Sequence, residues 1–348
     1  MVFNTTSAEI IDRIDGINSH ISAMKQVGFA LLGVGFSYLV YKFDYSNLLK
    51  YSPYLFVILN IFLVLVFVPK IGMQINGAHR WINFFGVSIQ PSEFVKFLLP
   101  IYYLHVFFQK KGSFTLKDFY LWQIPFMIPI FLIINEPDNG TAAILLVTMV
   151  TLYFLTKIRW IYWMVPIFLA LSAGVVLAMN MPHVSDRIHV YLHPESDLLG
   201  KGHQPYQAKI AAGSGGVFGK GLGDSLQKLN YLPEARSDYI AAIYAEEFGF
   251  VGILFLITLY MVIASLGFRI ASRANDLEGY FLGTIFTFII ALQAFLNLGI
   301  VSGILPSKGT NLPFFSQGGS SLLANIMMIA VLINIHAKAK GICQKPLQ

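Results

Sequence analysis

Acidic residues gather in the segment LPEARSDYIAAIYAEEFGFVG, residues 232–252. Glu234 and Asp238 lie four residues apart with Arg236 between them, where a polar stretch meets an apolar one. A carboxylate in partly desolvated, partly polar surroundings can take a proton from a hydroxyl group, so Asp238 is a candidate general base. The alternative is structural, because a carboxylate near a helix start also interacts favourably with the helix macrodipole.

Basic residues in two other polar segments could bind an anionic group. Arg80, in NGAHRWINFFGVSIQPSEFVKF, carries a guanidinium that can bind phosphate with two donors. Its neighbour Trp81 either belongs to the same site or anchors the chain at a membrane interface. Lys308, in GILPSKGTNLPFFSQGGSS, could meet an anionic headgroup as a point charge or simply be solvated. The prolines and glycines of that second segment predict a structured loop or a broken helix.

A glycine-rich segment, AAGSGGVFGKGLGDS, surrounds Lys220. Such a segment can bring backbone amides close to an anion, with Lys220 as a further ligand. It is not a Walker loop, because Ser214 stands where the first glycine is needed and Gly221 replaces the Ser or Thr after the lysine. The alternative is that the glycines permit turns or close packing of the backbone.

Three further charged residues have both a structural and a binding interpretation. Glu93 and Lys96 lie three apart after Pro91, which suits a first helical turn, so the two can pair on one face of a helix. Asp138 lies in NEPDNGT and is an ordinary turn residue. Each of the three either shapes the chain locally or contributes to substrate binding.

The elements that must position these residues are membrane helices. Of the 348 residues, 56% are hydrophobic and 12% charged, against roughly 25% charged in an average soluble domain. A span needs about 20 apolar residues and must satisfy its own backbone as a helix. The fold class is therefore all-α, a polytopic membrane protein. Nine spans are expected, at residues 26–43, 53–69, 91–109, 119–136, 141–157, 160–180, 239–267, 280–302 and 320–336.

Charge at the span ends predicts the orientation. Lysines and arginines collect on one side, from Lys42 and Lys50 to Lys338, Lys340 and Lys345, which places the carboxyl terminus in the cytoplasm. The expected organisation is a polar extracytoplasmic segment 1–25, one membrane domain 26–336 with an extracytoplasmic loop at about 181–238, and a cytoplasmic tail 337–348. The net charge of +6 is spread singly between spans, so membrane lipids are expected partners and nucleic acid is not.

Four sets of segments together resemble the SEDS family (shape, elongation, division and sporulation). They are NGAHRWI with QPSE, EPDNGT, GKGLGDSLQKLNYLPEARSD with AEEFG, and GILPSKGTNLPFFSQGGSS. They run in the family's order from about residue 26 to 336. LGDSLQKLNYLPEA and LPSKGTNLPF are more similar to the division-type members than to the elongation type. The family usually has ten spans, and the first is not apparent here: either the start codon is placed too late, or this version lacks that helix.

The resemblance implies a peptidoglycan glycosyltransferase that polymerises lipid II, the undecaprenyl-pyrophosphate-linked disaccharide-pentapeptide, at the outer face of the bacterial cytoplasmic membrane. Asp238 matches the essential aspartate of the family's PExxxD motif, and Trp81 matches a position important for function. Arg80, Lys308 and Lys220, or a divalent cation such as Mg or Mn, would stabilise the departing pyrophosphate. Glu93, Lys96, Glu234 and Asp138 carry over as residues that shape the cavity or its loops. Arg236 would pair with Asp238 or contact pyrophosphate.

The resemblance also implies partners and leaves other functions open. The implied partners are a class B penicillin-binding protein with transpeptidase activity and other division proteins. One alternative is a lipid II flippase, because the adjacent acids Glu246 and Glu247 inside a span suit a polar translocation path as well as an active-site cavity. The others are an elongation-type polymerase and an inactive scaffold for division proteins.

Overall fold

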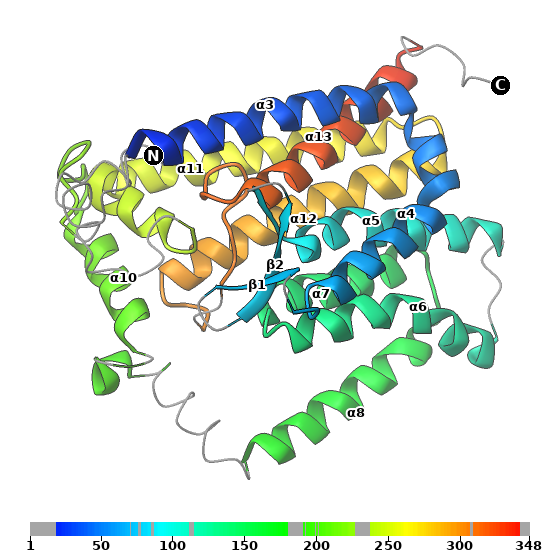
Figure 1. Cartoon of the computed structure of the whole chain (residues 1–348), viewed down its shortest axis with the longest axis horizontal. Helices are drawn as coiled ribbons and strands as arrows, with labels where there is room; N and C mark the ends of the chain where they lie inside the picture. Colours follow the sequence, from blue (N-terminus) through cyan, green and yellow to red (C-terminus); the bar gives the residue numbers. More distant parts are fainter. Residues whose placement is uncertain are drawn as a thin grey trace. The chain divides into compact units, whose positions relative to one another are not determined.

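The computed structural model describes residues 19–69, 71–75, 78–84, 87–110, 115–179, 191, 193–198, 200, 202–226, 237–306 and 309–341. Within these ranges lie nine long helices, each of which overlaps one of the nine predicted spans (Figure 1). They are α3 Ser19–Phe43, α4 Tyr45–Leu65, α5 Pro91–Gln109, α6 Leu116–Asn135, α7 Asn139–Leu155, α8 Trp160–Met179, α11 Ile240–Ser272, α12 Leu277–Val301 and α13 Gly319–Ala339. Six of these, α3, α4, α6, α11, α12 and α13, are long and apolar enough to cross a membrane by length and composition.

Some of the predicted boundaries were wrong. The span expected at 53–69 is helix α4, Tyr45–Leu65, which begins earlier and contains Pro53 inside it. Its first turns carry Ser46, Asn47 and Lys50, so hydropathy alone starts the span too late. The long segment at about 181–238, predicted only as an extracytoplasmic loop, contains the 3-10 helix η1 Pro194–Asp197 and helix α10 His203–Ser214. Helix α10 mixes polar and apolar residues, which hides it from a search for apolar spans.

The chain divides into two compact units. The first comprises the described residues of Met1–Gln26, Arg159–Tyr260 and Gln293–Gln317, and the second those of Val27–Ile158, Met261–Leu292 and Gly318–Gln348. In the second unit helix α5 is central, since it packs against α4, α6, α7, α13 and a small sheet. Its buried residues include the large side chains of Phe97 and Tyr103. Helix α5 therefore holds its own unit together.

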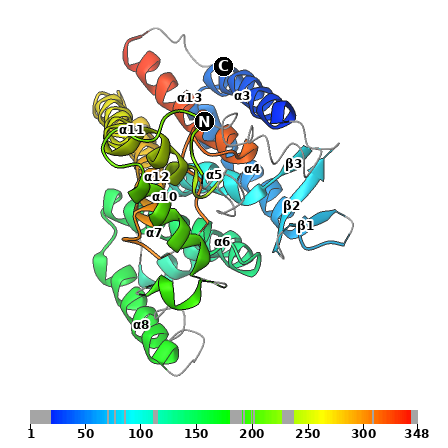
Figure 2. The same ribbon diagram turned by 90° about the vertical axis from the view of Figure 1, so that its left-hand side faces the viewer.

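A small antiparallel sheet precedes α5 and was not predicted. Its strands, β1 Gly72–Ile75, β2 Ala78–Phe84 and β3 Val87–Ile89, lie side by side in that order (Figure 2). Ile82 faces Gly72 on one side and Ile89 on the other, and is buried. The sheet places Arg80 and Trp81 on one strand, immediately before the helix that carries Glu93 and Lys96.

One sharp corner shows how this chain satisfies its backbone where a helix ends. Between α3 and α4, Asp44 has a φ of 64°, and the helix hydrogen-bond ladder stops there. Asn334 of α13, fully buried, accepts a hydrogen bond from the Tyr45 nitrogen (3.1 Å) and donates one to the Tyr41 carbonyl (2.8 Å). The single buried side-chain amide of Asn334 thus supplies a donor to the end of α3 and an acceptor to the start of α4, where backbone groups have no partner within the helix.

Candidate functional site

Asp238 lies directly before helix α11, and its backbone is fixed by a side chain from α12. The sequence predicted that Asp238 lies near a helix start, and helix α11 begins two residues later at Ile240. The amide nitrogen of Asn297 donates hydrogen bonds to the carbonyl oxygens of Asp238 (2.8 Å) and Thr310 (2.6 Å). Asn297 is fully buried. One amide group therefore joins the start of α11 to the segment between α12 and α13.

A serine makes a second connection next to it. The Ser316 hydroxyl donates to the Ser237 carbonyl (2.6 Å) and accepts from the Leu312 nitrogen (2.8 Å). The consecutive backbone carbonyls of Ser237 and Asp238 are thus both held by residues from far along the chain. These bonds to the backbone restrict where the Asp238 carboxylate can lie, and none of them is made by the carboxylate itself.

The Asp238 carboxylate lies over a glycine. A Cβ built on Gly309 would come within 2.9 Å of Asp238 Oδ2, so the absence of a side chain there lets the carboxylate lie against the backbone. Asp238 itself is partly exposed, whereas the next residue, Tyr239, is buried. The carboxylate is therefore at the boundary between the packed interior and an accessible surface, as a general base requires.

The segment between α12 and α13 is packed onto α11. The Phe315 ring meets the Tyr244 ring edge-on at 5.3 Å between centroids, and the Tyr260 hydroxyl donates to the Pro313 carbonyl (2.6 Å). Leu312 is buried in the apolar cluster that includes Ile240. The prediction of a structured loop is confirmed for the described residues 303–306 and 309–318, whose packing keeps Gly309 beside Asp238.

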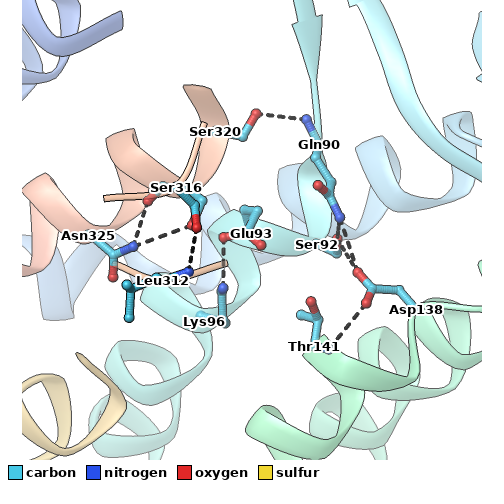
Figure 3. A network of polar contacts seen from close by, with 11 residues as sticks. Gln90, Ser92, Glu93, Lys96, Asp138, Thr141, Leu312, Ser316, Ser320 and Asn325 are labelled. Atoms are coloured by element: carbon cyan, nitrogen blue, oxygen red, sulfur yellow. Dashed lines mark hydrogen bonds and ion pairs between the residues drawn. The ribbon is translucent and has the colours of Figure 1, made fainter. Parts of the chain in front are cut away.

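A second polar cluster surrounds Asp138 at the α6–α7 turn, within the second unit. Its carboxylate accepts hydrogen bonds from the Gln90 side chain (3.1 Å), the Ser92 hydroxyl (3.4 Å) and the Thr141 backbone nitrogen (3.2 Å), all drawn in Figure 3. The Gln90 backbone nitrogen in turn donates to the Ser320 hydroxyl (2.9 Å). Asp138 is buried and caps α7. These contacts support its structural interpretation, as the residue that joins the starts of α5, α7 and α13.

The predicted Glu93–Lys96 pair is present. The Lys96 ammonium lies 2.7 Å from Glu93 Oε2 (Figure 3), and both side chains are buried within the first turns of α5. An ion pair removed from water gains little net stability, but loss of one partner leaves an uncompensated charge. Either residue substituted alone is therefore more disruptive than both together.

Arg80 binds backbone carbonyls across its own unit. Its Nε donates to the Glu136 carbonyl (3.0 Å) and its Nη2 to the Pro137 carbonyl (2.6 Å). The guanidinium thus joins the sheet to the turn that carries Asp138. Trp81, next on the strand, faces Met73 of β1 and is partly exposed.

Glu136 in this turn is a residue that the sequence did not single out. It is fully buried, and among the described residues neither of its carboxyl oxygens has a hydrogen-bond partner. It follows the last residue of α6 and so lies outside the helix. Burial, and then the neighbouring Asp138 carboxylate, raise the pKa of Glu136 to about 8, against an opposite effect of Arg80.

The remaining candidates lie elsewhere. The Lys220 ammonium pairs with the buried Glu246 carboxylate at 2.7 Å, so the structure gives it a partner within its own unit. Glu234, Arg236 and Lys308 lie outside the described residues. Within the described parts of the chain, no three His, Cys, Asp or Glu side chains form a group that could hold a metal ion.

Comparison with known proteins identifies the family. A family of FtsW, RodA and SpoVE proteins, described as cell cycle proteins, matches residues 1–341. The chain belongs to the SEDS family. It is 37% identical over 319 residues to the probable peptidoglycan glycosyltransferase FtsW of Trichlorobacter lovleyi, covering 91% of this chain and 84% of that protein. It is 38% identical over 322 residues to the stage V sporulation protein E of Bacillus subtilis, covering 91% and 87%.

A solved structure shares the SEDS fold. One chain of a peptidoglycan synthase complex, described as coordinating polymerization and crosslinking, aligns with a TM-score of 0.76 at 23% identity. The alignment covers 97% of this chain and 96% of that one. At this identity the likeness establishes the fold alone, and it confirms the all-α membrane architecture.

Replacement of Asn297 by leucine should destabilise this SEDS chain. The leucine keeps the volume but leaves the carbonyls of Asp238 and Thr310 without their donor, which costs about 1–3 kcal/mol. Thermal unfolding in detergent measures the loss. Asn47→Leu is the matched control, because its amide makes one exposed bond to the Phe43 carbonyl and its loss should cost well under about 1 kcal/mol. Equal losses in the two variants would contradict the assigned role of Asn297.

Glu136 should make stability depend on pH. Its pKa in the folded chain, about 8, lies above its ordinary value of 4.5, so the folded chain holds a proton that the unfolded chain has released between these values. The stabilising effect is complete below about pH 4.5 and is lost as the pH rises through 8. Glu136→Gln should therefore unfold with a flatter pH profile and be more stable than the parent at pH 8.5, by about 1–4 kcal/mol. Denaturant unfolding between pH 5 and 9, with the exposed Asp224→Asn as control, tests this; parallel profiles for parent and Glu136→Gln would refute it.

Proposed function

We propose that this protein is a peptidoglycan glycosyltransferase that polymerises lipid II into glycan strands at the outer face of the bacterial cytoplasmic membrane, for septal wall synthesis during cell division. The observation that carries the proposal is Asp238, a partly exposed carboxylate whose backbone is fixed by Asn297 and Ser316 and which lies over Gly309. It is supported by the relatives named as probable peptidoglycan glycosyltransferases.

In the proposed mechanism Asp238 is the general base. Its carboxylate takes the proton of the acceptor's GlcNAc 4-hydroxyl while that oxygen forms a bond to the anomeric carbon of the donor. The bond from that carbon to the pyrophosphate oxygen breaks, and the lipid pyrophosphate departs with the electron pair. The negative charge on the leaving group calls for cationic groups. The Arg80 guanidinium has five N–H donors, and its bonds to the carbonyls of Glu136 and Pro137 use only two of them. Arg80 therefore remains a candidate for stabilising the departing pyrophosphate, together with Lys308.

The proposed partner is a class B penicillin-binding protein, whose transpeptidase would crosslink the strand, together with other division proteins. A chain with this fold occurs in a complex described as coordinating polymerization with crosslinking, which supports a partnered enzyme. Location at the division site is part of the proposal and is supported by the FtsW names of the relatives.

The contacts of Glu246 argue against the flippase alternative, in which this residue would line a polar translocation path. Its carboxylate accepts hydrogen bonds from Lys220 (2.7 Å), Ser225 (2.5 Å) and Ser214 (3.3 Å). A carboxylate with this many donors is held in place. It is suited to anchoring a segment rather than to carrying protons or substrate along a path.

Asp238→Asn should abolish polymerisation while leaving the fold intact. The amide keeps the shape but cannot accept the proton, and loss of a general base typically lowers a rate by about 10²–10⁴-fold. Purified protein with its cognate transpeptidase, supplied with lipid II, should form glycan strands that a gel resolves, and the variant should not. Asp224→Asn removes an exposed carboxylate from the same long segment and should polymerise normally.

Two outcomes would reject parts of this proposal. Unchanged strand formation by Asp238→Asn would remove Asp238 as the base. Lipid II transport in reconstituted vesicles by a parent protein that forms no strands would replace the enzyme with a transporter.

A further inference from the structure

The membrane-spanning helix α11 is interrupted at Gly249, and the glycine-rich segment, residues 211–225, provides hydrogen-bond partners for the backbone there. Gly249 has a φ of 65° and ψ of −162°, so the regular ladder stops there. Backbone hydrogen bonds of 2.9–3.1 Å cross from the segment to both sides of the break. They run from Phe250 N to Gly216 O, from Val251 N to Val217 O, from Lys220 N to Glu246 O and from Gly221 N to Glu247 O. Irregular backbone at membrane depth is tolerated only where the protein itself satisfies it.

The glycines are needed because the two backbones touch. A Cβ on Gly219 would lie 2.1 Å from the Glu247 carbonyl oxygen, and one on Gly249 would lie 2.4 Å from the Gly219 nitrogen. Both residues also have positive φ. These contacts favour the packing interpretation of the glycine-rich sequence over an anion-binding loop.

A half-buried ion pair locks the segment to the helix. Glu246, fully buried, accepts from the Lys220 ammonium and from the Ser225 hydroxyl, at 2.7 and 2.5 Å. The backbone and side-chain bonds together fix the conformation of the segment against the first turns of α11.

The locked segment presents apolar side chains on its outside. Phe218 is 83% exposed, Leu222 71% and Val217 58%. We call these three residues the apolar tip. They adjoin the exposed apolar face of α11, which includes Phe250 at 64% and Phe255 at 60%. That face belongs to a span whose most apolar 18 residues have a mean hydropathy of 2.4 and are only 11% buried within the chain. Its composition therefore suits contact with acyl chains.

The length of α11 beyond Gly249 indicates how deep in the bilayer the break lies. From Phe250 to Arg269, the first basic residue at the far end, the rise is about 29 Å at 1.5 Å per residue. The hydrocarbon core is about 30 Å thick. With Arg269 at one boundary, Phe250 lies at the other, on the side that the charge bias predicts to be outer. The apolar tip, whose Val217 pairs with Val251, is then level with the outer edge of the hydrocarbon.

We propose that the glycine-rich segment is a membrane wedge: its apolar tip enters the outer leaflet beside α11 and contacts lipid acyl chains, while the Lys220–Glu246 pair holds it from within. The proposal follows from the continuity of the tip with the lipid-facing surface of α11 and does not depend on the enzymatic activity. It assigns Lys220 to anchoring the segment and removes it from the substrate-binding candidates.

Spin labels can measure the depth of the tip. The single Cys343 is first replaced by serine, and a nitroxide is then placed separately at Phe218→Cys and Leu222→Cys in vesicles of phosphatidylethanolamine and phosphatidylglycerol. Collision with oxygen relative to a water-soluble nickel chelate reports depth. Phe255→Cys, further along the exposed face of α11, is the deep reference, and the exposed Asp224→Cys is the aqueous one. Both tip labels should be shielded from nickel and lie shallower than the Phe255 label by several ångströms.

Two results would overturn the wedge. Nickel accessibility at both tip positions equal to that at Asp224→Cys would place the tip in water. Accessibility in the protein alone, followed by shielding when the transpeptidase partner is added, would assign the tip to a protein interface. Because both tip residues are exposed, the substitutions should not disturb folding, and elution from size exclusion checks this for each variant.

Discussion

A helix that breaks inside or at the edge of a bilayer leaves backbone amides and carbonyls that neither water nor lipid can satisfy, and the chain must supply their partners. Four breaks in the described structure have such a supply. Asn334 serves the corner between α3 and α4, and Asn297 the start of α11. Arg80 binds the carbonyls of the α6–α7 turn, and the glycine-rich segment pairs with the backbone around Gly249. The positions of the polar residues follow from this requirement before any role in catalysis.

The need to satisfy interrupted backbone distinguishes polar residues with a structural role from residues that could take part in a reaction. Asp238 has its backbone bonded through its carbonyl and its carboxylate set over Gly309, so the reactive group is positioned by bonds made elsewhere. Asp138 differs, because it is buried and its carboxylate accepts hydrogen bonds from Gln90 and Thr141. Two aspartates that look alike in sequence thus differ in exposure.

The sequence predicted the parts of the fold that depend on local composition. Nine apolar stretches became nine helices in the described chain, and Glu93 and Lys96, three apart on one helix, do pair. It did not predict the sheet that carries Arg80, because its strands are short and rest on pairing between neighbours, nor the break at Gly249, because glycine inside an apolar run resembles a continuing helix. It also missed Asn297, whose partners lie up to 59 positions away along the chain.

The claim that the chain satisfies its own broken backbone is tested most directly by hydrogen–deuterium exchange in lipid nanodiscs, read on peptides covering the glycine-rich segment and the break at Gly249. The account predicts slow exchange there, comparable with helix α5, and selective loss of this protection in Gly249→Ala, whose Cβ would collide with the Gly219 nitrogen at 2.4 Å. Exchange within seconds in the parent protein, or protection that Gly249→Ala leaves unchanged, would contradict it.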